Sequence, residues 1–141
     1  MRITLKESES FHGHLGPYLV LGVLAGELAL KKLKAKKYFG LEVKVYGVKE
    51  KPKSCLIDGL QLSTGATYGK GNISKFNSSL IKLEFINKAN TEKLTLRFKN
   101  GLIKKLLKTK THQDSELLAR QLYNTDFSKL FSLQLTVCNW S

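Results

Sequence analysis

Hydrophobic and polar positions along the chain follow two different periods. From Tyr18 to about Lys37 the apolar residues recur at intervals of three and four and cover most of the circumference, which predicts a long buried helix. Pro17 suits the first turn of that helix, and Gly40 ends it. Period-two alternation predicts half-buried strands in four later segments, at residues 41–46, 81–85, 94–98 and 131–137.

Shorter helical patterns lie between these strands. Cys55 to Ser63 predicts a short helix closed by Gly65, and further helices are expected at residues 102–108 and 115–123, the last with Asp114 as its N-cap. The glycine-rich stretch 64–72 has no apolar period and is expected to be irregular. This order favours an α+β fold: a mostly antiparallel sheet packed on the long N-terminal helix and smaller helices.

Length and composition indicate one domain over residues 1–141. With 42% apolar and 25% charged residues, the chain can bury a core without disulfides. Residues 1–9 lack the pattern of a signal peptide, and the apolar stretch 15–30 is interrupted by Glu27 and too short to span a membrane. Two cysteines are too few for a disulfide framework, so we expect a cytoplasmic protein with no membrane partner.

The formal net charge of +13 raises affinity for any polyanion. Five lysines lie between residues 31 and 37, at the end of the predicted long helix, where cations complement the helix dipole. A solvated helix end is the ordinary interpretation of this cluster. A nucleic-acid-binding protein is the less favoured alternative, because no stacking aromatic residues are interleaved with the lysines.

Two histidines flank a single glycine just before the long helix. Gly13 permits a turn that would let His12 and His14 converge on one metal ion. The alternative is that one histidine caps the helix and the other faces water.

A second group of candidate residues surrounds Cys55. This residue lies just ahead of a helix expected to begin near Asp58, and a helix N-terminus would lower the pKa of the thiol, unless the cysteine is simply buried and inert. Asp58 and Gln61 are three residues apart on one helix face, where they would orient a histidine or hold a substrate amide; alternatively Asp58 only caps the helix. Lys70, between Gly69 and Gly71, offers an anion cradle that lacks P-loop spacing.

Taken in order, these segments resemble the signature of the FmdE family of formylmethanofuran dehydrogenase proteins. The resemblance rests on Phe11-His12-Gly13-His14-x-Gly-Pro17, on Leu21-Gly22 with Ala25-Gly26-Glu27-Leu28-Ala29, and on the run from Cys55-x-x-Asp58-Gly59-x-Gln61 through Thr64-Gly65-x-Thr67-x-Gly69-Lys70-Gly71-Asn72. It covers residues 11–76 strongly, and the strand after Leu130-Phe131 is similar to the end of the same domain.

The resemblance implies a homodimeric α+β domain whose cleft binds a metal, typically zinc, through the HGH histidines and a cysteine. The ligands would be His12, His14 and Cys55, with Cys55 and Asp58 as candidate catalytic groups and Gln61, Thr67 and Lys70 around the substrate.

The function implied is an enzyme, or an accessory component of a redox complex, in one-carbon or molybdopterin-linked metabolism. A non-catalytic module that binds a small ligand or a protein is the alternative. Two departures bear on the metal: Gly16 and Ala66 stand where the family often has cysteine. The paired cysteines of a C-terminal zinc ribbon are also absent from this sequence.

Overall fold

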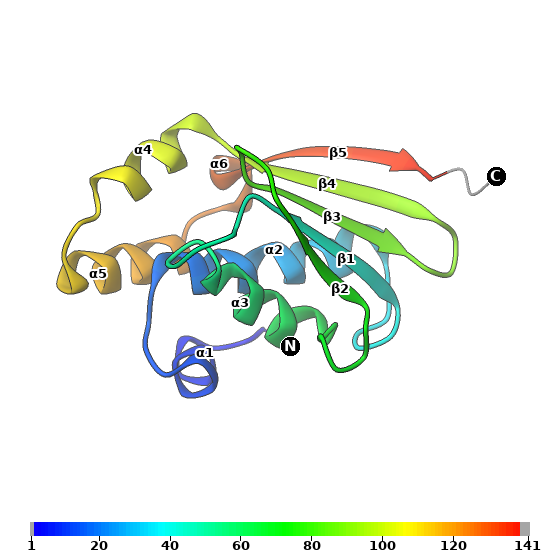
Figure 1. Cartoon of the computed structure of the whole chain (residues 1–141), viewed down its shortest axis with the longest axis horizontal. Helices are drawn as coiled ribbons and strands as arrows, with labels where there is room; N and C mark the ends of the chain where they lie inside the picture. The colour runs from blue at the N-terminus through cyan, green and yellow to red at the C-terminus, as the bar shows by residue number, and fades with distance from the viewer. Residues whose placement is uncertain (1, 139–141) are drawn as a thin grey trace.

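A computed structural model describes residues 2–138 of the chain. Within that range a five-stranded sheet in the order β2-β1-β3-β4-β5 packs against helices, as Figure 1 shows. The strands are β1 (Leu41–Tyr46), β2 (Ile73–Phe76), β3 (Lys82–Asn87), β4 (Glu92–Phe98) and β5 (Phe131–Val137). The helices are α1 (Leu5–His12), α2 (Pro17–Leu33), α3 (Cys55–Thr64), α4 (Asn100–Lys108), α5 (His112–Tyr123) and α6 (Phe127–Leu130).

The sheet confirms the α+β prediction. β1 pairs in parallel with β2 and antiparallel with β3, and β3–β4 and β4–β5 are also antiparallel. Alternation places one set of strand side chains against the helices, where they are fully buried: Val43, Val45, Leu83, Phe85, Leu94 and Leu96. The opposite set forms a mostly polar outer face. The apolar core therefore lies between one face of the sheet and the helices.

The long helix α2 is the central element of the helical layer. Pro17 occupies its first turn, as predicted, and most of its side chains are buried. The helix ends at Leu33 instead of about Lys37, because Lys34 adopts a left-handed conformation with φ 51° and its N–H donates to Leu30 and Lys31 carbonyls.

Two glycines bring α2 and α3 into backbone contact. A Cβ atom added at Gly22 would lie 2.3 Å from the Leu56 carbonyl oxygen, and one added at Gly59 would lie 2.1 Å from the Leu19 carbonyl oxygen. Both distances are shorter than any normal contact, so only glycine fits. The close approach expected at Gly22 is therefore real, and its partner is α3, not a strand or a second subunit.

Three short elements had no clear signal in the sequence. α1 has no long apolar stripe, but Thr4 and Glu7 form a reciprocal capping box at its start. β2 has four residues, and α6 is a single turn capped by Asp126. α5 begins at His112 instead of Ser115, because the Thr111 hydroxyl accepts the hydrogen bond from the backbone N–H of Asp114; the expected cap, Asp114, lies inside the helix.

Among the described residues, no single helix has the length and apolar character needed to cross a membrane. α1 and α2 meet such a test only when taken together, and their axes are bent by 119° at the break between them.

Candidate functional site

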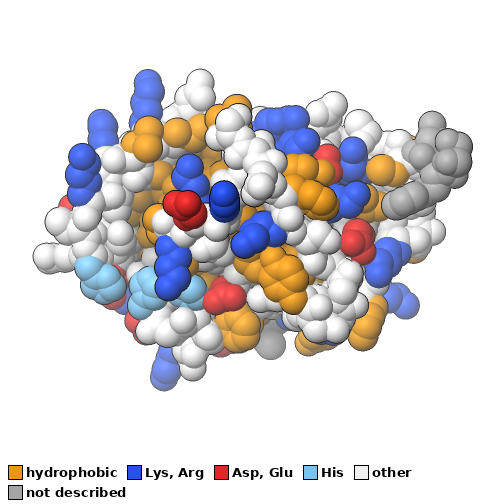
Figure 2. All heavy atoms as spheres, viewed as in Figure 1, with side chains coloured by type: hydrophobic (Ala, Val, Ile, Leu, Met, Phe, Trp, Pro, Cys, Tyr) orange, Lys and Arg blue, Asp and Glu red, His pale blue; other side chains and the backbone are white. Residues whose placement is uncertain are grey.

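A small pocket of about 110 Å³ opens where the ends of four helices meet. Its lining comes from the end of α1, the start of α2, the start of α3 and the connection between α4 and α5. The chain has three histidines, and His12, His14 and His112 all line this pocket together with Cys55. Figure 2 shows the histidines as one pale-blue group at the end of the molecule where α1 and α5 lie in Figure 1. The pocket thus gathers imidazole and thiol groups.

His12 is held in place by a carboxylate from α3. It is the last residue of α1, and its Nδ1 lies 2.6 Å from Oδ2 of Asp58. The Gln61 amide nitrogen donates to the other oxygen of Asp58 at 3.4 Å. An ionised carboxylate can only accept, so Nδ1 carries the proton and Nε2 keeps its lone pair. Nε2 is buried and has no hydrogen-bond partner in the described part of the chain, which leaves it free as a ligand.

Gly13 turns the chain so that the two neighbouring imidazoles lie on the same side. It ends α1 with φ 108°, a left-handed conformation that favours glycine. The ring centroids of His12 and His14 are 4.8 Å apart, so the predicted convergence of the pair is confirmed. Burial lowers the pKa of His14, as do the nearby His12 and His112. The environment therefore favours the neutral imidazole, which is the form that binds metals.

Cys55 is the first residue of α3 and is half-buried at the pocket. The sequence placed the start of this helix near Asp58 and predicted a lowered pKa for the thiol. Both expectations are wrong: the helix includes Cys55, and burial, followed by the negative charge of Asp58, raises the pKa of the thiol. Without a cation beside it, Cys55 stays protonated at neutral pH and is a weak nucleophile.

The pocket wall beside His14 has room for one more side chain. A Cβ atom added at Gly16 would lie 3.7 Å from Nε2 of His14, an ordinary contact distance, and no other atom comes within 4 Å. The family often has cysteine at this position. A thiol there would lie next to the imidazole, so this chain lacks one donor that its relatives place in the same pocket.

The other sequence candidates belong to the loop after α3. Gln61 reaches Asp58 on one side and accepts from the Tyr68 backbone N–H at 3.2 Å on the other. Thr67 and Lys70 do not line the histidine pocket. The Lys70 ammonium donates to the Gly65 carbonyl at 2.9 Å, so it closes the loop on itself. Their role in binding substrate stays a prediction.

The donor atoms of the pocket are near one another without forming a finished coordination site. Within residues 2–138, no three His, Cys, Asp or Glu side chains are close enough together to hold a metal ion as they stand. His14 and His112 are exposed, and their ring centroids are 6.0 Å apart. Exposed imidazoles can rotate with little loss of packing, so the donor set fits a metal that draws these side chains inward.

His112 is the site residue that the sequence reasoning missed. It lies far from the HGH motif, at the start of a helix whose beginning was misplaced by three residues. Histidine is rare in this chain, and that rarity was the available signal. Three histidines separated by about a hundred residues and lining one pocket point to a shared role.

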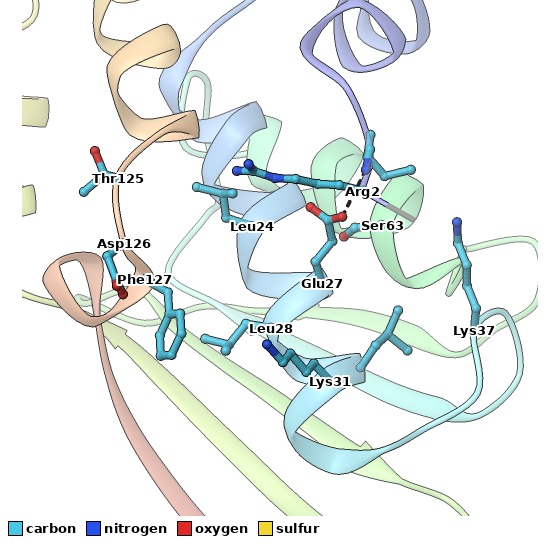
Figure 3. Close-up of a pocket in the computed structure, with 12 residues that line it drawn as sticks. Arg2, Leu24, Glu27, Leu28, Lys31, Lys37, Ser63, Thr125, Asp126 and Phe127 are labelled. Carbon is cyan, nitrogen blue, oxygen red and sulfur yellow. Dashed lines mark hydrogen bonds between the residues drawn. The ribbon is translucent and has the colours of Figure 1, made fainter.

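A larger cavity of about 800 Å³ lies along another side of α2 (Figure 3). Glu27 is at its centre with Arg2 alongside, and Lys31 and Lys37 lie further out. Glu27 accepts the backbone N–H of Ile3 at 3.0 Å. Burial raises the pKa of this carboxyl group. The carboxylate therefore fastens the N-terminal segment to α2, and we assign the cavity a structural role.

Comparison with known proteins agrees with the geometry. The family described as "FmdE, Molybdenum formylmethanofuran dehydrogenase operon" matches residues 11–132, which is most of the chain. The chain therefore belongs to the FmdE family.

A solved structure of an FmdE-like protein of tungsten formylmethanofuran dehydrogenase, from Syntrophus aciditrophicus, has the same fold, with a TM-score of 0.68 and 18% identity. The similarity covers 96% of this chain and 71% of that one. A "Probable S-adenosyl-L-methionine-binding protein" of Archaeoglobus fulgidus is 35% identical over 92 residues, which is 64% of this chain and 23% of that protein. The chain therefore spans about a quarter of the length of this relative.

Proposed function

We propose that the histidine pocket binds one divalent metal ion, zinc, through His12, His14 and Cys55, with His112 as an additional ligand. The observation that carries this proposal is the convergence of all three histidines and one cysteine on a single pocket. The buried free Nε2 of His12 supports it, because a buried imidazole nitrogen without a partner is costly unless something binds it.

The donor chemistry favours zinc over harder cations. Two or three imidazoles and one thiolate form the mixed nitrogen and sulfur set that zinc prefers in tetrahedral sites, whereas magnesium and calcium take oxygen ligands. Asp58 would act from behind His12, fixing its tautomer and ring orientation, as carboxylates commonly do for metal-bound histidines. This role replaces the catalytic-base role that the sequence suggested, because Asp58 already accepts a hydrogen bond from the histidine.

A zinc ion in this pocket would supply a Lewis acid able to polarise a carbonyl group or a water molecule. The pocket volume of about 110 Å³ leaves room for a small group and not for a whole cofactor. Membership of the FmdE family supports a place in one-carbon or molybdopterin-linked redox metabolism, as an enzyme or as an accessory component of a redox complex. A thiolate ligand also requires reducing surroundings, in agreement with the expected cytoplasm.

We also propose that the protein is a homodimer, as its family resemblance implied. β5 is an edge strand, drawn in red in Figure 1. Leu133, Leu135 and Val137 are between 37% and 66% exposed on the side of β5 that faces the same way as the core residues of β4. An edge strand with uncovered apolar side chains is suited to pairing with a second copy.

Metal analysis of the untagged protein tests the proposed site. Protein grown with added zinc should carry about one zinc per chain, and His14→Ala, Cys55→Ser and His112→Ala should each lower this content, the first two to a small fraction. Cys138→Ser, which changes the other thiol, is the matched control and should keep the metal. Cobalt substitution adds a spectroscopic measurement, because a thiolate–cobalt absorption should be present in the wild type and lost in Cys55→Ser.

Two results would refute the assignment. One is substoichiometric zinc in the wild-type protein after growth with added zinc. The other is full zinc content in both His14→Ala and Cys55→Ser.

A further inference from the structure

The outer face of the sheet carries polar and aromatic side chains in register across the strands. The pairing Phe76–Tyr46–Lys82–Arg97–Ser132 forms one row over all five strands. Neighbouring strands are about 4.8 Å apart, so the distance from Phe76 to Arg97 is about 14 Å. The side chains of this row point away from the helices, because they alternate with the buried set.

Two aromatic rings begin the row. Tyr46 and Phe76 stack with their centroids 5.0 Å apart and their planes inclined by 23°. The Lys82 ammonium lies 4.4 Å from the centroid of the Tyr46 ring, so Tyr46 is enclosed between a ring and a cation. Phe76 is 41% exposed. The exposed side chain of Phe76 is therefore a flat apolar surface at the edge of a cationic row.

The central part of the face is held rigid by one acid. Glu84 accepts from the Tyr46 hydroxyl at 3.1 Å and lies 3.7 Å from Lys82 and 3.5 Å from Lys93. Burial and the charge of Glu84 both raise the pKa of Tyr46, so its hydroxyl stays protonated and keeps donating. Lys44 lies in the next row, across from Glu84, and Arg97 is exposed at the end of the aromatic row.

The charge of this face disfavours a second copy as its occupant. Four cations, Lys44, Lys82, Lys93 and Arg97, share the outer surface with two acids, Glu42 and Glu84. Two such faces packed together would bring an excess of like charges into contact. A polyanion with flat rings complements both features, and single-stranded nucleic acid has unstacked bases for the aromatic surface and phosphates for the cations.

We propose that this outer face is a binding surface for single-stranded RNA. A base stacks on Phe76, and the phosphates that follow it lie along Lys44 and Arg97. The sequence argued against nucleic acid because no aromatic residues are interleaved with the lysines. That argument was incomplete: the row contains one residue from each strand, so strand pairing brings together rings and cations that are far apart in the sequence.

Fluorescence anisotropy with a labelled 12-nucleotide RNA of mixed sequence tests the proposal. Phe76→Ala should weaken binding about ten-fold, the loss expected for one stacked base. Phe76→Leu preserves apolar packing on Tyr46 while removing the flat ring, and it should weaken binding similarly. Lys44→Gln combined with Arg97→Gln should reduce the slope of log affinity against log salt by about one to two.

The matched control removes two charges elsewhere. Lys34→Gln combined with Lys36→Gln, on exposed residues after α2, should change affinity and salt slope much less than the sheet-face pair. The proposal is overturned if the control pair and the sheet-face pair have equal effects, or if both Phe76 variants bind like the wild type. It is also overturned if a duplex of the same length binds as tightly, because a duplex offers no unstacked base.

Discussion

The Nδ1 atom of His12 lies 2.6 Å from Oδ2 of Asp58, a residue 46 positions later in the chain. This contact joins the end of α1 to α3 and leaves Nε2 of His12 facing the pocket. Asp58→Asn removes the charged acceptor while preserving the size of the side chain. We expect zinc affinity to fall between ten-fold and a hundred-fold, as for other partners of metal-bound histidines, with little change in thermal stability. Competition with a coloured chelator measures this affinity, and an unchanged value would contradict the role given to Asp58.

Gly16→Cys should strengthen metal binding. The new Cβ atom would lie 3.7 Å from Nε2 of His14, so the thiol would be added beside the existing donors without a clash. We expect at least a ten-fold gain in zinc affinity and a stronger thiolate–cobalt absorption. Gly16→Ser adds a side chain of similar size with a poorer zinc ligand, and it should show neither change. Equal affinities for the two variants would mean that this wall does not face the metal.

Zinc affinity should increase with pH, and Cys55 should be the cause. Its pKa is raised, mainly by burial, so the thiol is protonated at neutral pH and must lose its proton to bind zinc. His14 has a lowered pKa and is already neutral there, so it contributes no slope. Below the pKa of Cys55 we expect the affinity to rise about ten-fold per pH unit, with release of one proton. Calorimetry in buffers of different ionisation enthalpy measures this release, and in Cys55→Ser it should disappear.

Gly22→Ala should destabilise the fold strongly. The added methyl group would lie 2.3 Å from the Leu56 carbonyl oxygen, and this neighbour is backbone that cannot rotate away. We expect a loss of about 3 kcal/mol or more in the free energy of unfolding, because α2 and α3 must separate. Gly101→Ala is the matched control: nothing lies within 4 Å of its added Cβ atom, so it should be neutral or stabilising by up to about 1 kcal/mol. Urea unfolding of the two variants gives the comparison.

Leu135→Lys should convert the proposed dimer into a monomer. Leu135 is 54% exposed on the edge strand β5, where a second copy would cover it. Leu107→Lys introduces the same change at a residue that is 71% exposed on α4, and it should leave the dimer intact. Light scattering coupled to size exclusion reports the mass. A monomeric wild-type protein, or a dimer that survives Leu135→Lys, would exclude this interface.

The sequence predicted the parts of the fold that have a clear period. α2 and four of the strands were found because their apolar residues repeat over many positions. α1 and β2 were missed because each is short and half-exposed, so capping and strand pairing decide their structure. The C-terminal end of α2 was misplaced because a single left-handed residue, Lys34, ends it without a glycine.

The candidate site was predicted in part for the same reason. His12, His14 and Cys55 stand in a recognisable motif, and the structure brings them to one pocket. The pKa of Cys55 was predicted in the wrong direction, because burial is a property of the tertiary structure and no local pattern reports it. His112 comes from a distant helix, so only the folded chain places it beside His14.

The glycine contact between α2 and α3 also sets the dimensions of the site. The HGH turn leads into α2 and Cys55 opens α3, so the separation between imidazoles and sulfur depends on how closely these two helices lie. A homologue could keep every donor residue and still lose the metal if one methyl group at Gly22 or Gly59 pushed the helices apart. Conservation of this pair of hydrogens is thus a better mark of a working site than conservation of the ligands alone.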